Sequence, residues 1–284
     1  DRLEAEHDNL RAALEWCRTR EDNPEYGLRL AGALWKFWEV RGYWSEGRAW
    51  LEGTLARSGE LMNSLRVKGL NGAAYLAFFQ GDYERAAALG EESLALSRKL
   101  GDKRGTASCL NILGLEACRL ERYDRAAALG EESLALSREV GDRGGVADAH
   151  AVMGLVARGQ GDYTRAAALL QESLAQARQL GDKWRVAIVL NNLGLVVREQ
   201  GDYDRAKTLL EETLAQFRLL GDKWGIAFSQ SNLGIVAWNQ GDHERAELLF
   251  RESLLLRREL GDKRGITTSL VGLAAVAAAR GQAE

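Results

Sequence analysis

Three asparagines, Asn71, Asn111 and Asn191, occupy one position of a pattern that repeats every 40 residues. A carboxamide offers one acceptor and two donors, so it can pair with the N–H and the C=O of an extended peptide segment whatever that segment's side chains are. Repeated along a groove, such side chains would form a ladder of hydrogen bonds. An asparagine on a helix surface also bonds readily to a neighbouring part of its own chain, and the spacing does not separate these two roles.

Charged and aromatic residues recur in neighbouring columns of the same pattern. Arg158 and Arg198 stand 40 residues apart and could grip a carboxylate, although two solvated arginines would show the same spacing. Phe78, Phe228 and Trp238 could form apolar pockets at the ends of a groove. The complete set of candidate binding residues is Asn71, Tyr75, Phe78, Asn111, Arg158, Asn191, Arg198, Phe228 and Trp238.

Residue constellations typical of catalysis are not found in the sequence. The 3 histidines occur singly, without the HxxxH or HExxH spacing of a metal site. There is no GxxxxGK[ST] loop for phosphate, and the recurring glutamate pairs such as Glu91 and Glu92 are explained by a solvated helix face. We therefore predict that the protein is not an enzyme and has no catalytic residue, no cofactor and no metal.

Composition narrows the class of partner. The 284 residues carry a formal net charge of -3, which argues against binding to a nucleic-acid backbone. No run approaches the roughly 18 uninterrupted apolar residues of a membrane span. The 3 cysteines form no CxxC pair, which favours a reducing compartment. We expect a folded cytoplasmic protein that binds neither nucleic acid nor membrane.

Two turn signals alternate along the chain, each with a period of 40 residues. Gly81-Asp82-Tyr83 returns at 161, 201 and, as Gly-Asp-His, at 241, while Glu121-Arg122-Tyr123 fills the gap; Gly101-Asp102 returns at 141, 181, 221 and 261. Glycine ends a helix in the left-handed conformation, and the next aspartate caps the following helix. Each period therefore predicts a hairpin of two helices.

Small residues at fixed positions predict that these helices approach each other closely. A glycine inside a helix costs about 1 kcal/mol relative to alanine, so its recurrence in one register implies a packing role. The recurring small residues are Gly114, Gly154, Gly194 and Gly234 in the first helices and Ala126, Ala166, Ala206 and Ala246 in the second.

Leu193-Gly194, followed by Gly201-x-Tyr203 and Ala206, resembles the tetratricopeptide repeat over roughly residues 61–284. The resemblance implies an all-α fold, an α-solenoid in which antiparallel helical hairpins build a right-handed superhelix with first helices on its concave wall. The unit exceeds the usual length of about 34 residues, and Glu121 replaces a turn glycine. The longer unit is similar to the subgroup of kinesin light chain, Pins-type scaffolds and bacterial MalT-like regulators. Leu-Asn-x-Leu at Asn111 and Asn191 resembles the peptide-gripping asparagines of kinesin light chain.

Residues 1–58 depart from the period, and residues 59–284 are expected to form five full hairpins and a final unpaired helix. The first segment is helical in pattern and rich in tryptophan. Its tryptophans either cap the first repeat, as the end of a solenoid requires, or dock on an upstream module. They are Trp16, Trp35, Trp38, Trp44 and Trp50.

The sequence from Asp1 to Leu14, followed by Leu34-Trp35-x-Phe37-Trp38 and Gly42-Tyr43, resembles the segment after the nucleotide-binding and winged-helix domains of bacterial STAND ATPases, including LuxR-type and AfsR-type regulators. The resemblance implies that the repeats are the sensor arm of a signalling switch, with residues 1–58 facing an upstream nucleotide-binding domain. We expect a module that binds a protein or peptide in its concave groove. The alternatives are a sensor of a sugar or metabolite, as the MalT resemblance allows, and a passive scaffold.

Overall fold

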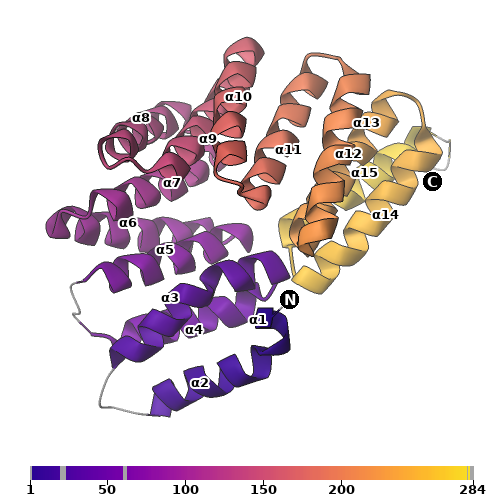
Figure 1. The fold of residues 1–284 in the computed structure, drawn as a ribbon. Helices are drawn as coiled ribbons and strands as arrows, with labels where there is room; N and C mark the ends of the chain where they lie inside the picture. The colour runs from indigo at the N-terminus through magenta and orange to yellow at the C-terminus, as the bar shows by residue number, and fades with distance from the viewer. Residues whose placement is uncertain (1, 20–23, 60–62, 280, 282–284) are drawn as a thin grey trace.

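The computed structural model describes residues 2–19, 24–59, 63–279 and 281, and within these ranges all regular secondary structure is helical (Figure 1). The helices stack one after another along a curved path, which confirms the predicted all-α solenoid of helical hairpins. They are α1 (Arg2–Ala5), α2 (His7–Thr19), α3 (Pro24–Arg41), α4 (Trp44–Arg57), α5 (Ser64–Phe79), α6 (Tyr83–Leu100), α7 (Lys103–Arg119), α8 (Tyr123–Glu139), α9 (Arg143–Gly159), α10 (Tyr163–Gln179), α11 (Lys183–Glu199), α12 (Tyr203–Leu220), α13 (Lys223–Asn239), α14 (His243–Leu260) and α15 (Lys263–Ala279).

The Gly-Asp pairs set where helices end and begin. Gly101 has φ 66°, and the carboxylate of Asp102 accepts a hydrogen bond from the backbone N–H of Gly105 at 2.8 Å. The same arrangement recurs through the chain because glycine reaches the left-handed region without a steric penalty. The turn between α7 and α8 departs from this arrangement, because Glu121 has φ 58° and Arg122 makes no side-chain cap.

Five consecutive hairpins follow the predicted period: α5 with α6, α7 with α8, α9 with α10, α11 with α12, and α13 with α14. Helix α15 comes next and packs on α13 and α14. The stack also extends towards the N-terminus, since α3 packs on α4 and both helices pack on α5.

The turn between α3 and α4 resembles the turns of the repeats. Gly42 has φ 78°, and this turn makes the same backbone hydrogen bonds as the turn at Gly81. The predicted boundary after residue 58 falls between α4 and α5, and residues 1 and 284 lie outside the described ranges.

The recurring glycines lie where helices come closest. A Cβ atom on Gly194 would stand 2.9 Å from Leu210 Cδ2, and one on Gly234 would stand 2.9 Å from Phe250 Cε1. Gly154 meets Leu170 in the same way, whereas Gly114 faces Val152 of the next first helix. These distances are shorter than side chains tolerate, so the close approach that the sequence predicts is present.

A column of buried hydroxyls also ties the two helices of a hairpin together. Ser133 Oγ donates to the carbonyl of Ala107 at 3.0 Å, and Ser173 Oγ donates to that of Ala147 at 2.7 Å. Ser253 makes the same bond to Ala227. Each hydroxyl lies on a second helix and donates a hydrogen bond to a carbonyl of the first helix. Buried polar groups in proteins are nearly always hydrogen-bonded in this way.

The first units meet the last ones where the superhelix completes a turn, at a contact that we call the seam. It consists of Lys36, Glu39, Phe79 and Tyr83 on one side and Trp184, Asp222, Trp224 and Arg264 on the other. Lys36 Nζ lies 3.2 Å from the centroid of the Trp184 ring, and the Phe79 and Trp224 rings are 4.6 Å apart. Figure 1 shows the N-terminal helices beside the lower end of α14. The first helices therefore surround a channel.

Gly194→Leu is expected to lower the free energy of unfolding by about 1–3 kcal/mol, because the new side chain would collide with Leu210. The measurement is urea unfolding followed by circular dichroism. Gly53→Leu is the matched control, since a Cβ on Gly53 meets nothing within 4 Å. An equal loss in both variants would show that helix packing at Gly194 is not the cause.

Glu121→Gly is expected to raise the free energy of unfolding by about 1 kcal/mol, because a non-glycine residue pays a steric cost in the left-handed region. The matched control is Glu131→Gly, an exposed position inside α8, where the same change should cost about 1 kcal/mol. Thermal unfolding of both variants checks the prediction, and a loss of stability in Glu121→Gly would contradict it.

Candidate functional site

The channel consists of two connected cavities, which we call the first cavity and the second cavity. The first has a volume of about 590 Å³ and the second about 370 Å³. Most of their lining residues come from the first helices of the hairpins, as predicted. The two cavities meet at a shared ring of side chains, which consists of Tyr75, Leu115, Leu155, Ile188 and Asn192.

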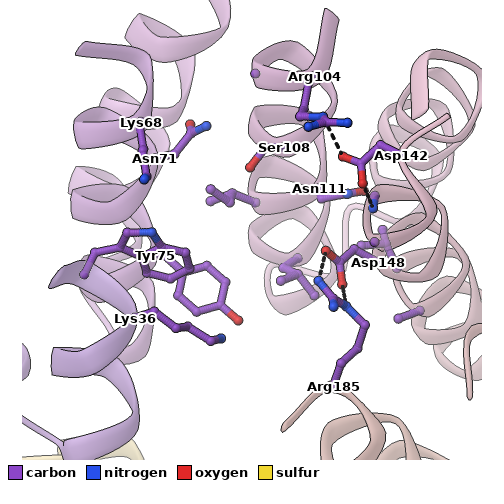
Figure 2. A pocket seen from close by; sticks show the side chains of 18 of the residues that line it. Lys36, Lys68, Asn71, Tyr75, Arg104, Ser108, Asn111, Asp142, Asp148 and Arg185 are labelled. Carbon is purple, nitrogen blue, oxygen red and sulfur yellow. Dashed lines mark hydrogen bonds and ion pairs between the residues drawn. The ribbon is translucent and has the colours of Figure 1, made fainter. Parts of the chain in front are cut away.

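The first cavity has charged walls whose charges balance. Arg185 binds Asp148 through two hydrogen bonds, from Nε at 2.7 Å and from Nη2 at 3.1 Å, and it also contacts Asp182 (Figure 2). Burial opposes the charge on Arg185, but the hydrogen bond and charge of Asp148 raise its pKa above the ordinary value. The lining contains four cations, Lys36, Lys68, Arg104 and Arg185, and four carboxylates, Asp102, Asp142, Asp148 and Asp182.

Two almost buried carboxamides line the channel and make no side-chain hydrogen bond among the described residues. Asn111 is 6% exposed, and its unpaired Oδ1 is covered by surrounding atoms. Asn192 is 8% exposed, lies where the two cavities meet, and makes no side-chain hydrogen bond within the described part of the chain. Asn71 lines the same wall and accepts a hydrogen bond from Cys109 Sγ at 3.1 Å. Because buried polar groups are nearly always paired, Asn111 and Asn192 are suited to a polar partner from outside the chain.

The structure brings seven of the nine predicted binding residues to the channel. Asn71 and Asn111 line the first cavity, and Tyr75 lines both cavities. The four that line the second cavity are Phe78, Arg158, Arg198 and Phe228.

The prediction that Asn191 and Trp238 face the groove is wrong. Asn191 is fully buried and turned towards α13, where its Oδ1 accepts a hydrogen bond from Asn232 Nδ2 at 3.1 Å. It therefore takes the alternative role, a bond to the neighbouring repeat, and the next residue, Asn192, faces the channel instead. Trp238 lies beyond Ile235, the last residue of α13 that lines the second cavity, and is 39% exposed.

One further column of the repeat faces the channel and was missed. Trp184 and Arg104 line the first cavity, and Trp224 and Arg264 line the second. These residues stand at multiples of 40 residues from one another, so the period itself could have identified them. They were missed because they lie near the starts of the first helices, one helical turn before the first predicted column.

The seam carries two buried carboxylic acids beside the first cavity. Glu39 is 4% exposed and pairs with Lys36, whose Nζ is 2.6 Å from Glu39 Oε2. Burial raises the pKa of Glu39 to about 7, although Lys36 acts in the opposite direction. Asp222 is 2% exposed and accepts hydrogen bonds from the backbone N–H of Gly225 and from Trp184 Nε1, both at 2.9 Å. Burial raises the pKa of Asp222 to about 6.

Two other kinds of site were sought in the described residues. Nowhere in them do three or more His, Cys, Asp or Glu side chains come together as metal ligands could. Among the described helices, none combines the length and the apolar character that a membrane span needs.

A family model described as tetratricopeptide repeat matches residues 66–139, 145–219 and 185–259 of the chain. No curated protein gives a significant match.

Several solved structures share the fold. A Rap protein complexed with competence and sporulation factor has a TM-score of 0.73 at 14% identity, covering 96% of this chain and 84% of that one. NprR in complex with its cognate peptide NprX has a TM-score of 0.73 at 13% identity, covering 100% of this chain and 86% of that one. A STAND protein with a tetratricopeptide repeat sensor, from Pyrococcus horikoshii, has a TM-score of 0.64 at 15% identity; the match covers 91% of this chain but 38% of that one.

The raised pKa of Glu39 predicts that stability falls as pH rises. Between about pH 4.5 and 7 the folded chain keeps a proton on Glu39 that the unfolded chain has lost, so unfolding releases a proton. The free energy of unfolding, measured with urea between pH 5 and 8, should decrease with pH. Glu39→Gln should flatten this slope, whereas Glu131→Gln, at an exposed position, should leave it unchanged. An unaltered slope in Glu39→Gln would contradict the assignment.

Proposed function

Because this chain belongs to the tetratricopeptide repeat family, we propose that it is a non-catalytic module that binds an extended peptide segment of a partner in its channel. The observation that carries the proposal is the pair of carboxamides at Asn111 and Asn192. Each is more than nine-tenths buried, lines the first cavity and makes no side-chain hydrogen bond within the described chain. A peptide backbone supplies both the donor and the acceptor that a carboxamide needs.

The arrangement of the asparagines suits a ligand that extends along the channel. Asn71 and Asn111 lie on adjacent first helices, α5 and α7, and both line the first cavity. Figure 2 shows Asn71 and Asn111 on neighbouring helices, above Tyr75. Asn192 lies further along, where the second cavity begins. These three amides would bind the backbone of a peptide whatever its side chains are. The charged and aromatic residues of the channel walls would contact the side chains and select among them.

The comparisons support a peptide as the ligand class. NprR, whose fold is similar over the whole of this chain, was solved with its cognate peptide NprX. The Rap protein was solved with competence and sporulation factor. At 13% and 14% identity these likenesses concern the fold, so the case for this chain depends on its own channel residues.

A sensor role in a signalling ATPase is the finer form of the proposal. It is supported by the resemblance of residues 1–58 to the segment that follows the ATPase domains in STAND regulators, and by the likeness to a STAND protein with a tetratricopeptide repeat sensor. In such a switch the peptide would act by binding two conformations of the arm unequally. The chain would then be a bacterial, cytoplasmic protein with its first helices against a nucleotide-binding domain. The coding sequence upstream of Asp1 tests this form of the proposal.

Substitution of the asparagines that line the channel tests peptide binding. The ligand probe is a synthetic library of random N-acetylated heptapeptides, selected on the immobilised protein and identified by mass spectrometry. For the peptides retained, Asn192→Ala and Asn111→Ala should each weaken binding about tenfold, the equivalent of one lost hydrogen bond in a buried site. Titration calorimetry measures the affinities.

Asn191→Ala is the matched control. It removes the hydrogen bond to Asn232, so it should lower the free energy of unfolding while the affinity of the folded protein is unchanged. The proposal would be wrong if the library yielded no bound peptide, or if Asn191→Ala and Asn192→Ala weakened binding equally in folded protein.

A further inference from the structure

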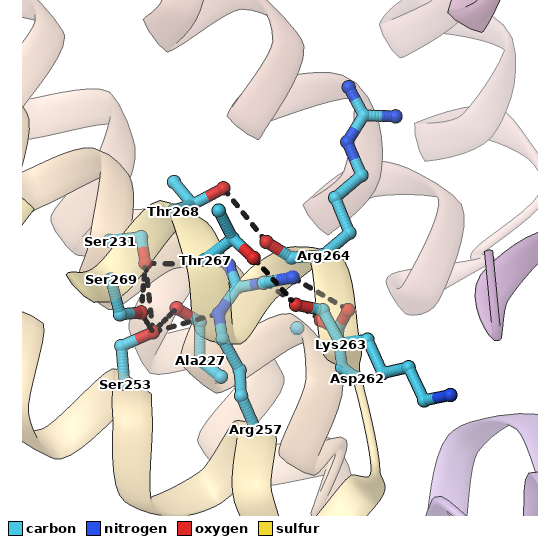
Figure 3. Close-up of polar contacts among 12 residues, drawn as sticks. Ala227, Ser231, Ser253, Arg257, Asp262, Lys263, Arg264, Thr267, Thr268 and Ser269 are labelled. Atoms are coloured by element: carbon cyan, nitrogen blue, oxygen red, sulfur yellow. Dashed lines mark hydrogen bonds and ion pairs between the residues drawn. The ribbon is translucent and has the colours of Figure 1, made fainter. Parts of the chain in front are cut away.

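The second cavity carries an excess of positive charge that the first cavity does not. Its lining includes one carboxylate, Asp262, which is already occupied: Arg257 Nη1 lies 2.7 Å from Asp262 Oδ2, and both side chains are buried (Figure 3). Against this one carboxylate stand five arginines, Arg119, Arg158, Arg198, Arg257 and Arg264. The chain as a whole has a net charge of -3, so this concentration of positive charge is local.

Partial compensation comes from one glutamate beside the cavity. Glu199 Oε1 lies 3.1 Å from Arg198 Nη2, and its Oε2 lies 3.7 Å from Arg158 Nε. The single carboxylate of Glu199 thus interacts with two guanidinium groups. It makes no ion pair with Arg119 or Arg264.

Arg119 and Arg264 have no ion-pair partner within the part of the chain that the structure describes. Arg119 stands at the end of α7 and Arg264 at the start of α15, so the second cavity brings together residues from helices far apart in sequence. Arg264 Nη1 donates a hydrogen bond to the neutral Tyr83 hydroxyl at 2.8 Å. In Figure 3 the guanidinium of Arg264 extends away from Arg257 and Asp262.

The unpaired guanidinium groups also act on each other. The surrounding channel walls remove part of the solvation of the Arg119 guanidinium and lower its pKa, and the positive charges of Arg264 and Arg158 lower it further. Arg119 and Arg264 line the second cavity, and their side chains are exposed rather than packed in the core. Their donors are therefore accessible, and an anion between them would relieve their repulsion.

We propose, building on the function proposed above, that Arg119 and Arg264 bind a carboxylate of the peptide in the second cavity. A planar carboxylate matches the fork of each guanidinium, and its two oxygens can serve one arginine each. The uncharged stretch of the peptide then runs past Asn192 into the first cavity, where the charges balance. The carboxylate comes either from the C-terminus of the peptide or from an acidic side chain near it.

Four heptapeptide libraries, all N-acetylated, distinguish the two sources of the carboxylate. They combine a free or an amidated C-terminus with the inclusion or omission of Asp and Glu. The amidated library without acidic residues should be retained at least tenfold less than the library that has both a free C-terminus and acidic residues. Restoring the free terminus alone or the acidic residues alone identifies which carboxylate binds. Equal retention of all four libraries would overturn the carboxylate site alone, and retention of none would overturn the proposed function together with it.

Arginine variants assign the effect to the two residues. Arg264→Gln and Arg119→Gln should each reduce the preference for the carboxylate-bearing libraries at least fivefold, and the remaining preference should weaken as salt is raised. Arg143→Gln, at an exposed position outside both cavities, is the matched control and should keep the full preference. Urea unfolding of each variant confirms that the protein assayed is folded. An undiminished preference in both folded variants would overturn the assignment to Arg119 and Arg264.

Discussion

The close approach of neighbouring helices at recurring small residues is the constraint on which the rest of this structure depends. Gly154, Gly194 and Gly234 each leave no room for a side chain, because a leucine or phenylalanine of the partner helix occupies that space. The spacing within a hairpin is therefore almost the same from unit to unit. When near-identical units stack with near-identical rotations, their first helices must follow a continuous curve. The channel is a consequence of this repetition and needs no separate structural element.

Completion of a superhelical turn gives the channel its closed cross-section. The first units then touch the last ones at the seam, where Lys36 lies over the Trp184 ring and Phe79 meets Trp224. This contact joins residues far apart in sequence and buries Glu39 and Asp222, two acids whose pKa values rise as a result. Burial of acids is unfavourable in their charged form, so the stability of the seam depends on pH.

The channel differs chemically from one end to the other. In the first cavity cations and carboxylates balance, and Arg104 and Arg185 pair with carboxylates of the same lining. The amides of Asn111 and Asn192 make no side-chain hydrogen bond among the described residues. In the second cavity arginines outnumber carboxylates, and Arg119 and Arg264 have no charged partner among the described residues. An elongated ligand with one anionic group would meet complementary surroundings in one orientation only. The uneven charge thus provides a basis for directional binding.

The sequence alone determined the hairpins, their period and the general direction in which each column points. These features are local: Gly-Asp turns end and start helices, and a 3.6-residue repeat sets one face inward. Only the tertiary structure decided the exact side-chain positions, because they depend on contacts with the neighbouring units. Asn191 accordingly bonds to Asn232 of the next unit while Asn192 enters the channel, and Trp238 falls outside it. The seam was equally invisible in the sequence, since it joins Lys36 to Trp184 and Tyr83 to Arg264, and such pairings depend on the accumulated rotation of all the units between them.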